Sequence, residues 1–68
     1  MSEVLIFSEY ITLGQKVRIL RIARRWTQDD LAYEAGVTQA QVSALERDLK
    51  VWQPAKDKVL SILGLINE

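Results

Sequence analysis

The sequence contains no cysteine and no histidine, and it has one proline and three glycines among its 68 residues. Without cysteine there are no disulfides and no thiol chemistry, and the usual ligands of zinc are missing. No apolar run approaches the ~20 residues that a membrane-spanning helix needs. The start of the chain lacks the basic residues and long apolar stretch of a secretion signal. We therefore expect a soluble cytoplasmic protein with no cofactor, no metal, no membrane partner and no evident small-molecule ligand.

The composition indicates a single globular domain. Hydrophobic residues make up 49% of the chain and charged residues 26%, which is typical of folded rather than disordered proteins. A chain of this length buries only a limited core and is marginally stable alone. Association with a second copy is therefore expected.

The charges balance to zero, with a pI near 6.2, which argues against a strongly basic nucleic-acid binder. Their distribution is uneven, because residues 16–25 carry no acid and the bases Lys16, Arg18, Arg21, Arg24 and Arg25. Such a segment can form a basic face if the acids point elsewhere. It can equally be the ordinary surface of a solvated helix.

The stretch from Thr27 to Arg47 predicts two short helices, over 28–35 and 39–47 or 48, joined by a tight turn. Gly36 stands where the first helix must stop and can adopt the left-handed conformation at little cost. A helix, a glycine-bearing turn and a second helix form the geometry of a DNA-binding helix-turn-helix.

Both helices carry the start signal called a capping box, in which a threonine and the residue three positions later satisfy each other's backbone N–H groups. Thr27 pairs with Asp30 in this way, and Thr38 pairs with Gln41.

Flanking helices complete an all-α, four- to five-helix bundle with the helix-turn-helix at its centre. The first is expected over 12–24, capped by Thr12, and the last begins near Pro54 and ends before Gly64. The apolar side of the last comprises Val59, Leu60, Ile62 and Leu63. An apolar stripe along the first helix comprises Leu13, Val17, Leu20 and Ala23, widened by Ile19 and Ile22.

We divide the chain into an N-terminal segment, residues 1–11, and a helix-turn-helix domain, residues 12–68. The apolar run Val4–Phe7 has the β-branched and aromatic composition of a short strand. A lone strand needs a partner, such as the same segment of a second subunit. A disordered tail and an extension of the first helix are the alternative interpretations.

The outward face expected for the 39–47 helix is polar and uncharged until its end. Glutamine can bond an adenine edge with both a donor and an acceptor, and alanine can touch a thymine methyl. The face therefore suits a major groove, although glutamine and alanine are also ordinary helix formers.

Three segments together, LGQKVRILR, WTQDDLA and AGVTQAQVSALER, resemble the phage-repressor and Cro type of helix-turn-helix, also called the xenobiotic-response-element family. The resemblance spans residues 13–64, and the small size is similar to the controller proteins of restriction–modification systems. It implies a transcription regulator, such as a repressor, that binds double-stranded DNA at a palindromic operator as a homodimer.

The resemblance assigns roles by position. It implies phosphate contacts at the start of the first helix of the motif and after the second, base readout mainly by Gln39 and Gln41, and a structural ion pair between Arg21 and Glu46. The DNA-binding residues that it implies are Thr27, Gln28, Thr38, Gln39, Ala40, Gln41, Ser43, Ala44, Arg47 and Lys50.

The sequence departs from the family pattern in two places. Asp48 stands where the family usually has glycine, and it adds a negative charge near the expected phosphate path. The fifth helix, which often forms the dimer surface, has almost no residues left to build it. Candidates to replace it are Trp52, Ile62, Leu65, Ile66 and the Val4–Phe7 segment, with Trp52 equally interpretable as a satellite of the core.

Two other functional classes were weighed. An interaction module or antitoxin that acts through protein partners fits the neutral charge and the acids Asp29, Asp30, Glu34 and Asp48. An enzyme is disfavoured, because there is no histidine, cysteine or glycine-rich phosphate loop.

Overall fold

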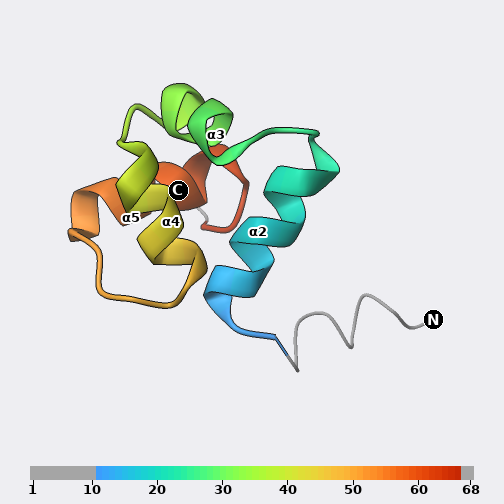
Figure 1. Cartoon of the computed structure of the whole chain (residues 1–68). Coiled ribbons are helices and arrows are strands. Elements are labelled where there is room, and N and C mark those ends of the chain that lie inside the picture. Colours follow the sequence, from blue (N-terminus) through green and yellow to red (C-terminus); the bar gives the residue numbers. More distant parts are fainter. Residues whose placement is uncertain (1–10, 67–68) are drawn as a thin grey trace.

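The computed structural model describes residues 11–66, and over that range the chain forms helices and no strand. The helices are α2 (Leu13–Ala23), α3 (Gln28–Ala35), α4 (Gln39–Glu46) and α5 (Gln53–Ile62) (Figure 1). This confirms the all-α fold class. The strand considered for Val4–Phe7 lies outside the described residues. None of the described helices has the length and apolarity to cross a membrane.

Helices α2, α3 and α4 all begin with the same device, a threonine capping box. In each, the threonine hydroxyl accepts a hydrogen bond from the backbone N–H three residues later, and that residue's side chain accepts one from the threonine N–H. Each such cap stabilises its helix by about 1 kcal/mol. The pairs are Thr12 with Gln15, Thr27 with Asp30 and Thr38 with Gln41.

The helix ends also follow the sequence signals. Gly36 adopts the left-handed conformation, with φ of 76°, immediately after α3. Gly64 does the same after α5, with φ of 74°. Pro54 sits in the first turn of α5, where its missing N–H costs no helical hydrogen bond. Helix α4 ends at Glu46, one or two residues earlier than the sequence indicated.

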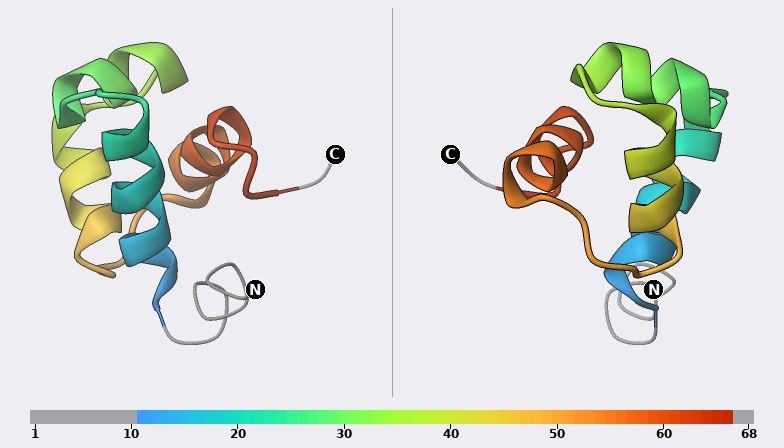
Figure 2. Two further views of the ribbon diagram at one scale, coloured as in Figure 1. Left: turned by 90° about the vertical axis from the view of Figure 1, so that its right-hand side faces the viewer. Right: turned by 60° about the vertical axis from the view of Figure 1, so that its left-hand side comes forward.

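The four helices bury one core. Figure 1 shows α2 and α4 side by side with α3 crossing at one end, and Figure 2 shows α5 on the far side of the core from the exposed side of α4. Leu65 and Ile66 pack partly buried against this core. The fully or almost fully buried apolar residues are Val17, Leu31, Ala32, Val42, Leu45, Ala55, Val59, Leu60 and Leu63.

Three residues predicted to lie on the apolar side of α2 are instead exposed, Ala23 of the stripe itself and the two that were expected to widen it. Ile19 and Ile22 leave 43% and 53% of their surface accessible, and Ala23 is exposed too. At 3.6 residues per turn, Ile19 lies about 200° and Ile22 about 140° around the helix from the buried Val17. Both therefore point away from the core. Ile62 on α5 was also expected inside, and it is 40% exposed.

Gly14 is buried on the inner face of α2, a role that the apolar pattern missed. A Cβ atom at this position would lie 2.6 Å from the carbonyl oxygen of Leu45 and 2.7 Å from that of Glu46. Both obstacles are backbone atoms, which cannot swing aside. The absence of a side chain at Gly14 therefore lets α2 approach the C-terminal end of α4.

We predict that Gly14→Ala lowers the free energy of unfolding by about 1–3 kcal/mol, the usual cost of overpacking. The added methyl must push α2 away from α4, although alanine is the better helix former. Urea unfolding of the full chain measures the change. Arg18→Ala on the exposed side of α2 is the control and should stay within about 0.5 kcal/mol of the parent. An unchanged or higher stability for Gly14→Ala would show that the two helices separate without cost.

Candidate nucleic-acid interface

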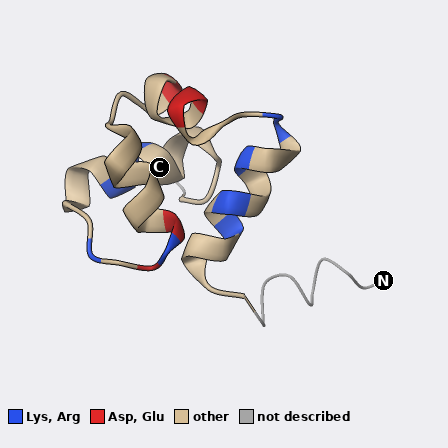
Figure 3. Ribbon diagram, viewed as in Figure 1, with Lys and Arg blue, Asp and Glu red and all other residues tan. Residues whose placement is uncertain are grey.

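Helices α3 and α4 form the helix-turn-helix that the sequence predicted, with Gly36 in the turn between them. The exposed side of α4 begins at Gln39 and Ala40, and the helix has no charged residue before Glu46 at its end (Figure 3). An exposed helix side without charge is unusual for a small protein, because solvated surfaces are normally rich in lysine and glutamate. This side offers amides and small side chains instead.

The end of α4 is tied to α2 by the ion pair between Arg21 and Glu46, which confirms the pairing expected from the sequence. The guanidinium donates from Nε to Oε2 and from Nη2 to Oε1, the latter at 3.1 Å, so the pair is bidentate. The two side chains are only 11% and 4% exposed. Arg21 also donates from Nη1 to the carbonyl of Trp26 at 2.8 Å, which holds the loop before α3.

A chain of hydrogen bonds runs from this ion pair to the start of α4. Gln28, the first residue of α3, donates from Nε2 to Glu46 Oε1 at 3.1 Å. Its Oε1 in turn accepts a hydrogen bond from Nε2 of Gln39, the first residue of α4. Each donor in this series of hydrogen bonds has one acceptor. One N–H of the Gln39 amide is therefore engaged by Gln28, and because the side chain is exposed, its Oε1 and second N–H remain for another partner.

The other polar residues expected at the major groove of DNA already use part of their hydrogen-bonding capacity within the protein. The Gln41 Oε1 accepts the backbone N–H of Thr38 at 3.0 Å, so only its NH2 group remains for another partner. The Thr38 hydroxyl accepts the N–H of Gln41 but keeps its own proton. Ser43 and Ala44 are half-buried farther along α4.

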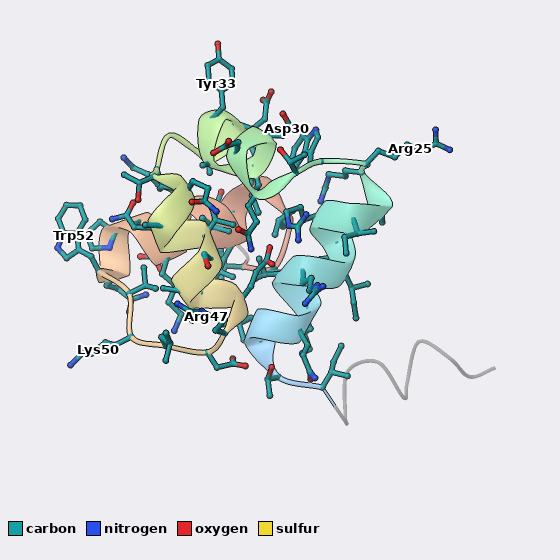
Figure 4. All side chains as sticks on the ribbon, viewed as in Figure 1. Arg25, Asp30, Tyr33, Arg47, Lys50 and Trp52 are labelled. Carbon is teal, nitrogen blue, oxygen red and sulfur yellow. The ribbon has the colours of Figure 1, made fainter. Side chains whose placement is uncertain are left out.

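Two exposed bases follow α4. Arg47 caps the end of the helix, and Lys50 projects from the loop that leads to α5 (Figure 4). Arg25 lies at the opposite end of the molecule, beyond α2. Of the bases in residues 16–25, Arg21 is turned inward to Glu46, and Arg24 lies over the Trp26 ring at 5.5 Å from its centroid. The exposed bases that follow α4 directly in the chain are therefore Arg47 and Lys50.

Asp48, which stands where the resemblance leads one to expect glycine, has a φ of 59°, in the left-handed region that favours glycine. Its carboxylate is not free to face a phosphate. Oδ1 accepts the backbone N–H of Gly14 at 3.0 Å, and Oδ2 accepts the hydroxyl of Thr12 at 2.7 Å. The negative charge thus sits at the N-terminus of α2, where the helix dipole stabilises it.

Sequence reasoning missed two roles in this interface. It flagged Asp48 as unusual but could not find its partners, because they lie 34 and 36 residues earlier in the chain. It assigned the Gln28 side chain to a phosphate contact, whereas its Oε1 already accepts a hydrogen bond from Gln39 and its Nε2 donates one to Glu46. Glutamines at the first positions of two successive helices were the available signal.

Among residues 11–66 there is no cluster of three or more acidic, histidine or cysteine side chains arranged to hold a metal ion. An open groove between α3 and α5 is lined by both charge signs and by apolar side chains, among them Glu34, Asp57, Lys58 and Ile62.

The profile of one protein family, described as a helix-turn-helix domain, matches residues 12–63 of the chain. That range begins at the cap of α2 and ends just after α5, so it covers all the described helices. No curated protein and no solved structure matches the chain.

We predict that breaking the Arg21–Glu46 pair from either side, by Arg21→Met or Glu46→Leu, lowers the free energy of unfolding by about 3 kcal/mol, because each variant strands a nearly buried charge. The double variant should lose clearly less than the two single variants together, because neither charge remains. Urea denaturation of all four chains completes the cycle. Strictly additive losses would show that the two side chains do not depend on each other.

Proposed function

The chain belongs to the helix-turn-helix domain family of DNA-binding regulators, and from this premise we propose that it is a sequence-specific transcription regulator of the phage-repressor and Cro type. In this proposal a homodimer binds a palindromic operator and inserts α4 of each copy into the major groove, in half-sites about 34 Å apart. The activity is binding, which represses or activates a nearby promoter, and needs no cofactor.

The observation that carries the proposal is the oriented amide of Gln39. Through Gln28 it is hydrogen-bonded to the Arg21–Glu46 pair, and because the side chain is exposed, its Oε1 and second N–H remain for a base. Adenine presents one donor and one acceptor in the major groove, and an amide can match both. A pre-oriented glutamine discriminates more sharply than a mobile one, because less side-chain freedom is lost on binding.

We assign the remaining contacts from the hydrogen-bond donors, acceptors and apolar groups that each side chain still has available. Gln41 has only donors left and suits base acceptors, while Ala40 is exposed and suits a thymine methyl. Ser43 and Ala44 allow close approach farther along α4. We assign phosphate contacts to Thr27, Thr38, Arg47 and Lys50, and to the backbone N–H of Gln28 at the start of α3 rather than to its side chain.

The test is selection of bound sequences from a pool of random duplex DNA at two salt concentrations. We expect one palindromic sequence to be enriched, with binding that weakens steeply as salt rises. Absence of any enriched sequence, with weak binding even at low salt, would reject DNA recognition and favour the interaction module or antitoxin.

We predict that Gln39→Ala, put through the same selection, loses preference at one base pair in each half-site. A lost bidentate contact costs about 1–3 kcal/mol of discrimination, which is roughly a five- to hundredfold loss of preference. Preference at the other positions should persist, because the fold does not need this side chain. Tyr33→Ala, which changes an exposed residue on α3, is the control. An unchanged sequence preference for Gln39→Ala would remove Gln39 from readout.

We predict that Arg47→Ala weakens binding to all sequences and lowers the slope of log affinity against log salt by about one ion per subunit. Fluorescence anisotropy titrations over a salt series measure this slope on the selected operator and on unrelated DNA. Arg25→Ala removes an equal charge from the opposite end of the molecule and should leave the slope unaltered. If the two variants behave alike, Arg47 is not at a phosphate.

A further inference from the structure

An exposed apolar stripe runs along the outer side of α2. Ile19 and Ile22 are 43% and 53% exposed, and Ala23 beside them is exposed as well. The three residues stand at the i, i+3 and i+4 spacing that places side chains next to one another on a helix surface. Single exposed apolar residues are ordinary, but a stripe at helical spacing is typical of a surface that another segment covers.

The charges beside this stripe all have one sign. The ionisable side chains of residues 13–25 are bases without exception, and those of Arg18, Arg24 and Arg25 are exposed (Figure 3). The exposed Tyr33 on α3 lies among acids, and both the loop after α4 and the groove between α3 and α5 carry both signs. Among the described surfaces, α2 alone combines exposed apolar residues with bases and no acid. It therefore suits an occupant that is apolar and acidic.

The chain contains a segment of that composition directly before α2. Residues 4–7 are valine, leucine, isoleucine and phenylalanine, Glu3 and Glu9 flank them, and residues 1–10 include no base. The described chain starts at Ile11, one residue before the cap of α2. The segment is therefore joined to the N-terminal end of the helix that carries the stripe.

We propose that the outer side of α2 is a docking surface for residues 4–7 of the same copy, which pack against Ile19 and Ile22. These two residues lie about 10 and 15 Å from Thr12 along the helix axis, at a rise of about 1.5 Å per residue. An extended chain covers about 3.3 Å per residue, so residues 4–7 can lie up to about 16–26 Å from Thr12. Residues 8–11 provide the four positions that a reversing turn needs. The segment is therefore long enough to run back along the stripe.

Apolar contact supplies the energy of this docking, and charge selects the place. Exposed ion pairs contribute little stability each, but Glu3 and Glu9 would face bases on α2, whereas on α3 they would face acids. Closing the short loop between the segment and the stripe costs little entropy. The covalent connection also gives the segment a high effective concentration at its own α2. Docking within one copy is therefore favoured over exchange with a second copy.

A double-variant cycle in the full chain tests this contact without DNA. The first variant carries Val4→Ser, Leu5→Ser, Ile6→Ser and Phe7→Ser together, and the second is Ile22→Ala. If Ile22 faced only water, Ile22→Ala would not lower stability, because alanine is the better helix former. With the segment docked, we predict that each variant raises the ratio of unfolded to folded chain in urea by at least about fivefold. Adding Ile22→Ala to the first variant should raise it no further.

Tyr33→Ala is the matched control, because Tyr33 is also an exposed aromatic residue but lies among the acids of α3. Its effect on unfolding should add to that of the four serine substitutions, since the two sites are not in contact. Strictly additive effects for Ile22→Ala as well, or no loss of stability in either variant of the cycle, would overturn the proposal.

Nuclear Overhauser contacts in isotope-labelled parent chain identify the occupant directly. We expect contacts between the ring of Phe7 and the methyl groups of Ile19 or Ile22, and these contacts should persist on dilution. A mixture of labelled and unlabelled chain should show none between copies. Contacts between copies would mean that a second copy supplies the segment, and contacts from Phe7 to α3 or α5 would place it elsewhere; either result rejects the proposal. Failure of the DNA selection would reject the proposed function and leave this contact standing.

Discussion

The candidate interface depends on the half-buried ion pair between Arg21 and Glu46. Removing two charges from water is costly, and the cost is met here because the carboxylate accepts three hydrogen bonds, two from Arg21 and one from Gln28. These bonds join α2, α3 and α4 at one point. The hydrogen bond from Gln39 to Gln28 then ties the exposed amide of Gln39 to this group of bonds. A substitution of Arg21 or Glu46 would therefore disturb the exposed amide of Gln39, although Gln39 is hydrogen-bonded to neither of them.

A second constraint, near the N-terminus of α2, explains how the chain tolerates an acid after α4. Gly14 allows the two helices to approach, and that closeness brings the N-terminus of α2 within reach of Asp48. The carboxylate is satisfied by the N–H of Gly14 and the hydroxyl of Thr12. Its two oxygens are therefore engaged within the protein at an exposed position, and the strain of a positive φ at Asp48 is offset by these bonds.

The separation of basic residues on α2 from acidic residues on α3 affects the affinity expected for DNA. A basic α2 and an acidic α3 flank an α4 whose exposed side is uncharged. Phosphate contacts supply most of the affinity of DNA-binding proteins, and near α4 the structure offers few bases. In the proposed dimer, two copies on one operator would double those contacts while holding both at high effective concentration. In such a design, association of the chain matters as much as the contacts of one copy.

The sequence by itself determined where α2, α3 and α4 begin and where α3 and α5 end, because capping boxes and the left-handed Gly36 and Gly64 are local signals that act within a few residues. It also located the helix-turn-helix and the Arg21–Glu46 pair through family resemblance. Only the tertiary structure decided which side of α2 is buried, exposing Ile19 and Ile22 and enclosing Gly14. The partners of Asp48 and Gln28 were decided in the same way. Those outcomes depend on how closely separate helices approach, and that distance is set by contacts between residues far apart in the chain.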